Sequence, residues 1–368
     1  MRILVVGNAD SIWVKTLIEH TMIPFNDRIA IVSIRNKVFK EYYSEKGISV
    51  FSPKTKNRKL AKILSVFIFM SRIVNDYELI TFQFLSDLNL CLLPIAKMAG
   101  KRTVLVAWGS DVLRKNRFGL AYHLAFKMTD KIALNGNRLN DKFVKMTGSK
   151  YINKSSIVKF GSPSFERFKE YEFSEKDIRK KLNIGLEKVI ISIGQNSNPL
   201  QQHLKVIDSI KALDEQHRRN IHILLKMTYG TGGDEYINTV YKEALSTGCS
   251  VMCFREFLTV DELIDITSIT DIFIQAQPTD VLSSTMCEHL YCGSLVINPE
   301  WLSYPELEED IFYLQYKDFD SLTCILKDNL FLKSKSKYVN ETKQNRDRIS
   351  RFLSWDYYID DWRKIYKN

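Results

Sequence analysis

The segment from Thr279 to Gly293 combines residue types that can hold an anionic ligand. It follows a strand-like run, and Thr279 or Asp280 is placed to cap a new helix. The backbone N–H groups in the first turn of a helix have no intrahelical acceptor, so this turn attracts anions such as a diphosphate. The hydroxyl side chains around the expected helix start are those of Ser283, Ser284 and Thr285. The sequence therefore predicts a diphosphate site at this helix N-terminus.

Two carboxylates belong to the same segment. Asp280 precedes the expected helix and Glu288 lies eight residues later, about two turns into it. Both can reach one extended ligand, and a carboxylate with the apolar neighbours of Glu288 needs a polar partner. A capping aspartate and a surface glutamate explain the same spacing.

A second candidate site follows a strand-like run in the first half of the chain. The apolar run Thr103–Ala107 leads through Gly109 to Asp111, at the carboxyl end of the strand. Open α/β sheets bind their ligands at such strand ends, and glycine allows a ligand to approach the backbone closely. A helix cap is the alternative role for Asp111. The loop after the first strand, from Gly7, lacks the full glycine pattern of a dinucleotide site.

Short apolar runs alternate with amphipathic segments along the chain, a pattern typical of parallel α/β sheets. The charged stretch from Gly161 to Lys181 separates two sets of such runs. We therefore expect an N-terminal domain over residues 1–165 and a C-terminal domain over 166–345. The aromatic-rich segment Arg346–Tyr366 has helical periodicity and is expected to form a C-terminal helix, residues 346–368. The expected strands are 3–6, 29–32, 48–51, 79–82, 103–107, 131–134 and 156–158 in the first domain, and 188–193, 221–226, 250–253, 271–275 and 295–297 in the second.

The composition is that of an ordinary globular protein. The chain has 368 residues, more than one hydrophobic core usually serves, and 45% of them are hydrophobic. No run reaches the roughly 18–20 apolar residues that a membrane-spanning helix needs. The first residues lack a signal-peptide pattern, so a cytoplasmic location is expected. The six cysteines form no C-x-x-C pair, which disfavours a zinc site and favours buried free thiols.

Positive charge is concentrated in the first half of the chain. Residues 1–180 carry 32 Lys and Arg against 16 Asp and Glu, whereas the remainder is net acidic. The asymmetry suggests an anionic partner, either nucleic acid or an anionic membrane. Nucleic acid is disfavoured because basic residues do not interleave with stacking aromatics. The segment Lys54–Met70 joins a basic cluster to an apolar helix and can lie on a membrane surface. A helix packed on the sheet explains that segment equally.

In their order along the chain, these segments resemble the GT-B glycosyltransferases, especially family 4. That family's acidic-x7-Glu motif is similar to the stretch from Asp280 to Glu288, and the small-Gly-apolar continuation of that motif is similar to residues 289–296. The turn from Trp108 to Asp111 resembles a turn that faces the cleft in the family's N-terminal domain. The resemblance implies two Rossmann-like domains with parallel sheets facing a central cleft. It also implies a C-terminal helix that crosses back to the first domain.

The resemblance assigns roles to these residues. It implies that Asp280 contacts the donor sugar and that Glu288 holds the nucleotide ribose. The acceptor side is implied for Gly7, Ser11 and Trp108. The family often carries histidine where this chain has Gln83 or Trp108, and neither residue accepts a proton at neutral pH. Asp111 therefore becomes the candidate that orients the acceptor hydroxyl.

The loop after the run Lys188–Ile193 resembles the family's Gly-Arg loop. The loop begins with Gly194, Gln195 and Asn196. Gln195 stands where arginine is usual, so the bidentate cationic clamp on the diphosphate is missing. Lys226, at the end of the next strand, can supply this charge, and a solvent-facing lysine is the alternative. The stretch around Lys226 also resembles the GT-B transferases that move fucosamine from a thymidine-diphosphate sugar.

We therefore expect a glycosyltransferase that acts in cell-envelope polysaccharide synthesis. Its donor is a nucleoside-diphosphate sugar, and its acceptor is a hydroxyl of a saccharide or of a polyprenyl-diphosphate-linked saccharide at the inner membrane. No cofactor and no metal ion are expected, because helix N–H groups and lysine can hold the diphosphate. The alternatives are a GT-B sugar-nucleotide epimerase and a nucleic-acid-binding protein. The nucleotide base, the sugar, retention or inversion, and the oligomeric state stay open at this stage.

Overall fold

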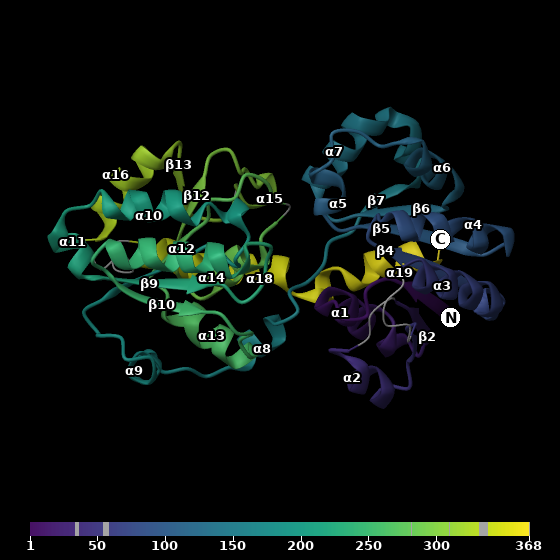
Figure 1. Cartoon of the computed structure of the whole chain (residues 1–368), viewed down its shortest axis with the longest axis horizontal. Helices are drawn as coiled ribbons and strands as arrows, with labels where there is room; N and C mark the ends of the chain where they lie inside the picture. The colour runs from purple at the N-terminus through teal and green to yellow at the C-terminus, as the bar shows by residue number, and fades with distance from the viewer. Residues whose placement is uncertain (34–36, 54–58, 281, 309, 331–337, 368) are drawn as a thin grey trace. The chain divides into compact units, whose positions relative to one another are not determined.

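The chain forms two compact units, each built on a parallel β-sheet with helices on both faces (Figure 1). The computed structural model describes residues 1–368 except 34–36, 54–58, 281, 309, 331–337 and 368. Unit 1 comprises residues 1–163 and 355–368, and unit 2 comprises residues 164–354. The division between Pro163 and Ser164 falls two residues before the expected domain boundary.

Unit 1 contains a seven-stranded sheet in the order β3-β2-β1-β4-β5-β6-β7, and all of its strand pairs are parallel. Its strands are β1 Arg2–Val6, β2 Arg28–Val32, β3 Ser49–Phe51, β4 Leu79–Gln83, β5 Arg102–Ala107, β6 Lys131–Leu134 and β7 Ser155–Ile157. Its helices are α1 Ile12–Thr21, α2 Lys40–Glu45, α3 Lys59–Ile73, α4 Asp87–Met98, α5 Ser110–Leu113, α6 Leu120–Met128, α7 Asn137–Thr147 and α19 Ile359–Lys367. Each of the seven expected strands is present within two residues of its predicted bounds.

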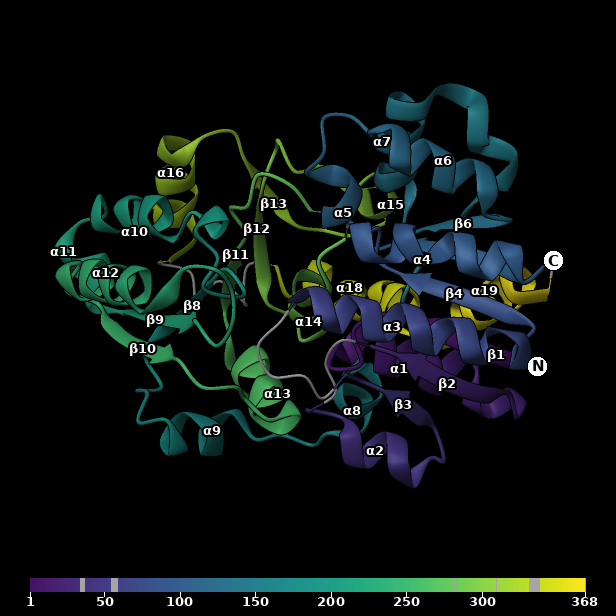
Figure 2. The same ribbon diagram turned by 45° about the vertical axis from the view of Figure 1, so that its right-hand side comes forward.

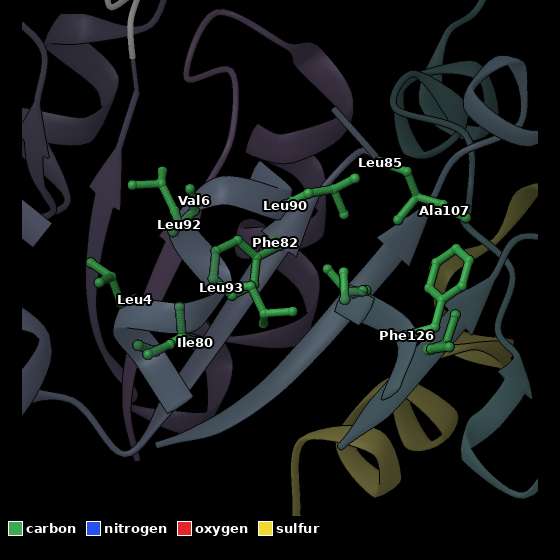
Figure 3. Packing of buried hydrophobic residues seen from close by; sticks show 14 of the residues in the cluster. Leu4, Val6, Ile80, Phe82, Leu85, Leu90, Leu92, Leu93, Ala107 and Phe126 are labelled. Carbon is green, nitrogen blue, oxygen red and sulfur yellow. The ribbon is translucent and has the colours of Figure 1, made fainter. Parts of the chain in front are cut away.

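The two faces of the unit 1 sheet bury separate cores. On one face, Ile80 and Phe82 of β4 pack with Leu92 and Leu93 of α4, as Figure 3 shows. The other face is covered by α1 and α19, which lie side by side in Figures 1 and 2. A strand buried on both faces must be apolar at nearly every position, which explains the continuous apolar run of β5.

Unit 2 contains a six-stranded parallel sheet in the order β10-β9-β8-β11-β12-β13. Its strands are β8 Val189–Ile193, β9 Ile221–Lys226, β10 Ser250–Phe254, β11 Ile272–Ile274, β12 Leu295–Pro299 and β13 Leu314–Tyr316. Its helices are α8 Phe165–Glu170, α9 Glu175–Lys181, α10 His203–Lys211, α11 Glu215–Arg219, α12 Gly233–Ser246, α13 Val260–Ile269, α14 Ser284–Tyr291, α15 Pro305–Glu308, α16 Phe319–Leu330 and α18 Val339–Leu353. The sequence did not predict β13, a three-residue edge strand that lacks a long apolar run.

The C-terminal segment differs from the single helix that its periodicity predicts. Helix α18 ends at Leu353 and packs Ile349 and Leu353 into a core of unit 2. Ser354 is extended, and α19 then packs Trp362 and Tyr366 against α1 in unit 1. Helical periodicity is the same in both helices, so only their different packing partners reveal the break.

Several other expectations concern segments outside these cores. Of the basic apolar segment Lys54–Met70, residues 54–58 lie outside the described residues. None of the described helices is long and apolar enough to cross a bilayer. The cysteines are free thiols as expected, but Cys91 and Cys324 are exposed rather than buried.

Candidate functional site

The sequence-predicted residues of the second half meet at one edge of the unit 2 sheet. Strand β8 lies beside β11, and from these two strands the sheet order runs in opposite directions. Open α/β sheets bind ligands at the carboxyl ends of strands at such a switch point. Gly194 directly follows β8, and its N–H donates to the carbonyl oxygen of Ile274 at the end of β11 (3.1 Å). The glycine loop and the segment that leads to α14 therefore leave the sheet at the same place.

The N-cap of helix α14 lies three to four residues after the capping residues that the sequence suggested. Its N-cap is Ser283, not Thr279 or Asp280, because the extended backbone of Ser283 places its hydroxyl over the first turn. The Ser283 Oγ accepts a hydrogen bond from the Met286 N–H (3.1 Å). The same hydroxyl donates to Oε1 of Gln195 in the glycine loop (3.2 Å). Ser284 and Thr285 form the first turn, where backbone N–H groups lack intrahelical acceptors.

The Glu288 carboxylate is buried at this helix and has polar partners. Its Oε1 accepts hydrogen bonds from the hydroxyls of Ser284 (3.2 Å) and Ser164 (2.9 Å). The surface position that spacing alone allowed is therefore wrong. Ser164 was not a sequence candidate, since it lies 124 residues from Glu288 and directly follows the division between the units.

Lys226 is also buried, at the carboxyl end of β9, which rules out the solvent-facing alternative. Among the described residues its ammonium has one hydrogen-bond acceptor, Nε2 of His289 (3.3 Å), and it lies 5.7 Å from the ring centroid of Phe273. Burial lowers the pKa of Lys226 to about 8, and the negative charge of Glu288 opposes this change. A buried ammonium with a neutral acceptor favours the arrival of an anion.

The Asp280 carboxylate is half-buried and held by a tyrosine from the loop after β12. The Tyr304 hydroxyl donates to Oδ2 of Asp280 (3.2 Å) and accepts from the Gln275 amide (2.6 Å). Tyr304 lies 24 residues beyond Asp280 in a segment without a distinctive pattern, so it was not predicted.

The glycine loop packs against the loop after β9. The Ser197 N–H donates to the carbonyl oxygen of Tyr229 (2.7 Å), and the Ser197 hydroxyl donates to the same oxygen (2.9 Å). Gly194 has a φ of +61°, and a Cβ there would lie 2.9 Å from Nε2 of His203. Glycine is therefore required at the start of this loop.

Unit 1 has its own switch point between β1 and β4. Gly7 follows β1, and a Cβ on it would lie 2.8 Å from Cβ of Gln83 at the end of β4. Four buried polar atoms near these strand ends have no hydrogen-bond partner in the described part of the chain. They are Oγ1 of Thr81, Oε1 and Nε2 of Gln83, and Nε1 of Trp108. Burial without a partner costs about 1–3 kcal/mol for each group, so the cluster favours a polar ligand.

Two further candidates of unit 1 lie at helix starts. The Asp111 carboxylate is buried and accepts hydrogen bonds from the backbone N–H groups of Leu85, Trp108 and Gly109. Burial raises the pKa of Asp111, and these hydrogen bonds oppose the rise. The contacts give Asp111 a structural role in its turn, while its proposed action on an acceptor hydroxyl stays a prediction. Ser11 is the N-cap residue of α1 and makes no side-chain capping hydrogen bond.

The described residues contain no group of three or more His, Cys, Asp or Glu side chains that could hold a metal ion.

Comparison with known proteins gives structural relatives only. No protein-family model matches the chain, and no curated protein sequence matches it. A glycosyltransferase from Rickettsia africae has a similar structure, with a TM-score of 0.81 and 14% identity over 100% of this chain and 97% of that chain. Anabaena HepE in complex with UDP and glucose has a TM-score of 0.78 and 14% identity, over 99% and 98% of the two chains. Sucrose-phosphate synthase from Thermosynechococcus elongatus has a TM-score of 0.73 and 10% identity, over 100% and 98%. The chain thus has the expected GT-B fold.

Proposed function

We propose that the protein is a glycosyltransferase that moves a sugar from a nucleoside-diphosphate sugar to a hydroxyl of a saccharide or lipid-linked saccharide. The fold supports this proposal, since the similar structures include a glycosyltransferase and a HepE complex that contains UDP and glucose. Fold does not fix function, so the proposal depends on the site in unit 2.

The observation that carries the proposal is the pairing of Glu288 with the start of its own helix. The buried Glu288 carboxylate lies on α14 one turn from Ser284, and it accepts a hydrogen bond from the Ser284 hydroxyl. A ribose presents two neighbouring hydroxyls that donate to a carboxylate, and the attached phosphates need N–H donors and positive charge. Glu288, the first turn of α14 and Lys226 provide these groups in one unit.

The same groups can stabilise the departing diphosphate. When the bond from the sugar to the diphosphate breaks, negative charge develops on the diphosphate oxygen. Fixed N–H dipoles at Ser284 and Thr285, and the Lys226 ammonium in its buried position, stabilise that charge without reorganisation. The proposal therefore includes metal-independent transfer, because these groups can take the place of a metal ion. Asp280, held by Tyr304, is the proposed contact to the donor sugar.

The acceptor is proposed to bind unit 1 at the carboxyl ends of β1, β4 and β5. Gly7 and Trp108 lie at these ends, and Gln83 adds an amide that both donates and accepts. A saccharide hydroxyl matches such neutral donors and acceptors.

A lipid-linked acceptor places the proposed reaction at a membrane surface in cell-envelope polysaccharide synthesis. Leu64 and Ile68 lie four residues apart on α3, and 60% and 46% of their surfaces are exposed. Adjacent apolar side chains on one helix face, next to a basic sequence, suit a peripheral contact with anionic lipid.

Nucleotide binding tests the proposal. We expect UDP, GDP or dTDP to stabilise the protein against thermal unfolding. At a nucleotide concentration of 100 times its dissociation constant, the free energy of unfolding should rise by about 2.7 kcal/mol. Calorimetric titration of the bound nucleotide should then show that Glu288→Gln weakens binding about 10- to 100-fold, as expected for a lost charged acceptor. Glu243→Gln is the matched control, because Glu243 is exposed on α12. The assignment is refuted if none of the three nucleotides binds, or if Glu288→Gln binds as tightly as Glu243→Gln.

A further inference from the structure

A chain of three buried hydrogen bonds leads from the backbone to the Lys226 ammonium. The Ser294 hydroxyl donates to the carbonyl oxygen of Thr270 (2.9 Å). Its Oγ also lies 3.2 Å from Nδ1 of His289, and Nε2 of the same ring lies 3.3 Å from Nζ of Lys226. The side chains of Lys226, His289 and Ser294 are all buried.

The chemistry of the groups at the two ends fixes the direction of each bond. A carbonyl only accepts, so the single hydroxyl hydrogen of Ser294 points to Thr270. Toward His289 the Ser294 oxygen is then an acceptor, and Nδ1 carries the ring hydrogen. Nε2 is left with a lone pair that accepts from Lys226, because an ammonium only donates. The opposite tautomer would direct an N–H at the ammonium, and it would keep a hydrogen bond to Ser294 only if the hydroxyl turned away from the Thr270 carbonyl oxygen.

The surroundings keep the ring neutral and in place. Burial and the charge of Lys226 hold the pKa of His289 well below its usual value. The ring stacks on Phe273, with 4.3 Å between centroids and 12° between planes. The titratable groups that face Lys226 are His289 and Glu288 on α14 and Cys292 just after it, and both Glu288 and Cys292 favour the charged lysine. Among the residues that the structure describes, the ammonium has one hydrogen-bond acceptor, the neutral His289 ring, so its other N–H groups can serve a ligand.

We propose that Ser294 and His289 are positioning residues that hold the Lys226 ammonium ready for the diphosphate by fixing the His289 tautomer. This inference rests on the proposed function only for the identity of the anion. Its central claim, that Ser294 fixes the tautomer and thereby stabilises charged Lys226, concerns the free protein.

Nuclear magnetic resonance of the free protein tests the tautomer. In protein labelled with 15N-histidine, we expect the His289 ring to be neutral and to carry its hydrogen on Nδ1 at neutral pH. In Ser294→Ala the Nδ1–H loses its acceptor, so the Nε2–H form, which can donate only to an uncharged Lys226 amine, should gain population. Ser294→Thr retains a hydroxyl and should keep the Nδ1–H form. Ser209→Ala is the matched control, because Ser209 is a buried serine of α10 that hydrogen-bonds to backbone carbonyls away from this chain of bonds.

The titration of Lys226, followed by its 13Cε signal, tests the consequence. Loss of the acceptor in Ser294→Ala should lower the Lys226 midpoint, whereas Ser294→Thr and Ser209→Ala should leave it in place. UDP affinity measured above this midpoint should fall about three- to tenfold in Ser294→Ala. A wild-type ring with its hydrogen on Nε2 overturns the inference even if Ser294→Ala does not fold, and so does an unchanged Lys226 midpoint in folded Ser294→Ala. If UDP, GDP and dTDP all fail to bind while the Nδ1–H form and the midpoint shift are observed, the proposed function fails and the positioning of Lys226 stands.

Discussion

Replacing Asp111 with asparagine measures how far its carboxylate stabilises unit 1. Oδ2 of Asp111 accepts from the Leu85 N–H (2.9 Å), Oδ1 accepts from the Gly109 N–H (2.8 Å), and the Trp108 N–H lies 3.1 and 3.2 Å from the two oxygens. An asparagine amide has one oxygen, so its NH2 group must face either the Leu85 or the Gly109 N–H. The variant therefore buries one backbone donor and one amide donor without acceptors.

The magnitude follows from these two groups. Each unsatisfied buried donor costs about 1–3 kcal/mol. Burial raises the pKa of Asp111, so removing the buried charge offsets part of the loss. We expect Asp111→Asn to lower the free energy of unfolding of unit 1 by about 2–4 kcal/mol. Asp141→Asn, at an exposed position on α7, should change it by less than about 0.5 kcal/mol.

Urea unfolding followed by tryptophan fluorescence suits this measurement. Unit 1 contains Trp13, Trp108, Trp355 and Trp362, four of the five tryptophans of the chain. UDP affinity should stay unchanged in Asp111→Asn under folding conditions, because the proposed nucleotide site belongs to unit 2. An unfolding free energy equal to that of Asp141→Asn would refute the structural role of the carboxylate.

Four further outcomes are expected. Wild-type UDP affinity should fall as the pH rises from about 7 to about 9, because only charged Lys226 attracts the diphosphate. Above the Lys226 pKa of about 8, the fall should be at most about tenfold per pH unit. Lys226→Met should bind UDP more weakly at pH ~7 and lose this pH dependence in calorimetric titrations; an equally steep profile would exclude Lys226 as the titrating group. Trp362→Ala should destabilise unit 1 by about 3–5 kcal/mol in urea unfolding, because the ring is fully buried and its Nε1 donates to the Lys159 carbonyl oxygen (2.9 Å). Tyr357→Ala, at an exposed position, should leave this free energy of unfolding nearly unchanged. Thr259→Ala removes the capping box of α13 and should lower the free energy of unfolding of unit 2 by about 1 kcal/mol, measured in urea through the fluorescence of Trp301. An unchanged unfolding midpoint would show that the cap is dispensable.

The sequence by itself determined the fold class and most strands. Strands such as β5, buried on both faces, require apolar residues at successive positions, and this local constraint is visible in the chain. The same logic placed Gly7, Gly194 and Lys226 at strand ends, because parallel strands bring their carboxyl ends to one edge of the sheet. The segment from Asp280 to Glu288 also carried enough local pattern to indicate a helix N-terminus with two carboxylates.

Only the tertiary structure decided how these residues are paired. Ser164 reaches Glu288 across 124 residues, and Tyr304 reaches Asp280 from a loop without a distinctive pattern. The break at Ser354 was hidden because α18 and α19 share one periodicity but pack in different units. Periodicity shows which face of a helix or strand is buried. The hydrogen-bond partners of that face depend on which other element covers it, and that element is determined only when the whole sheet and its helices assemble.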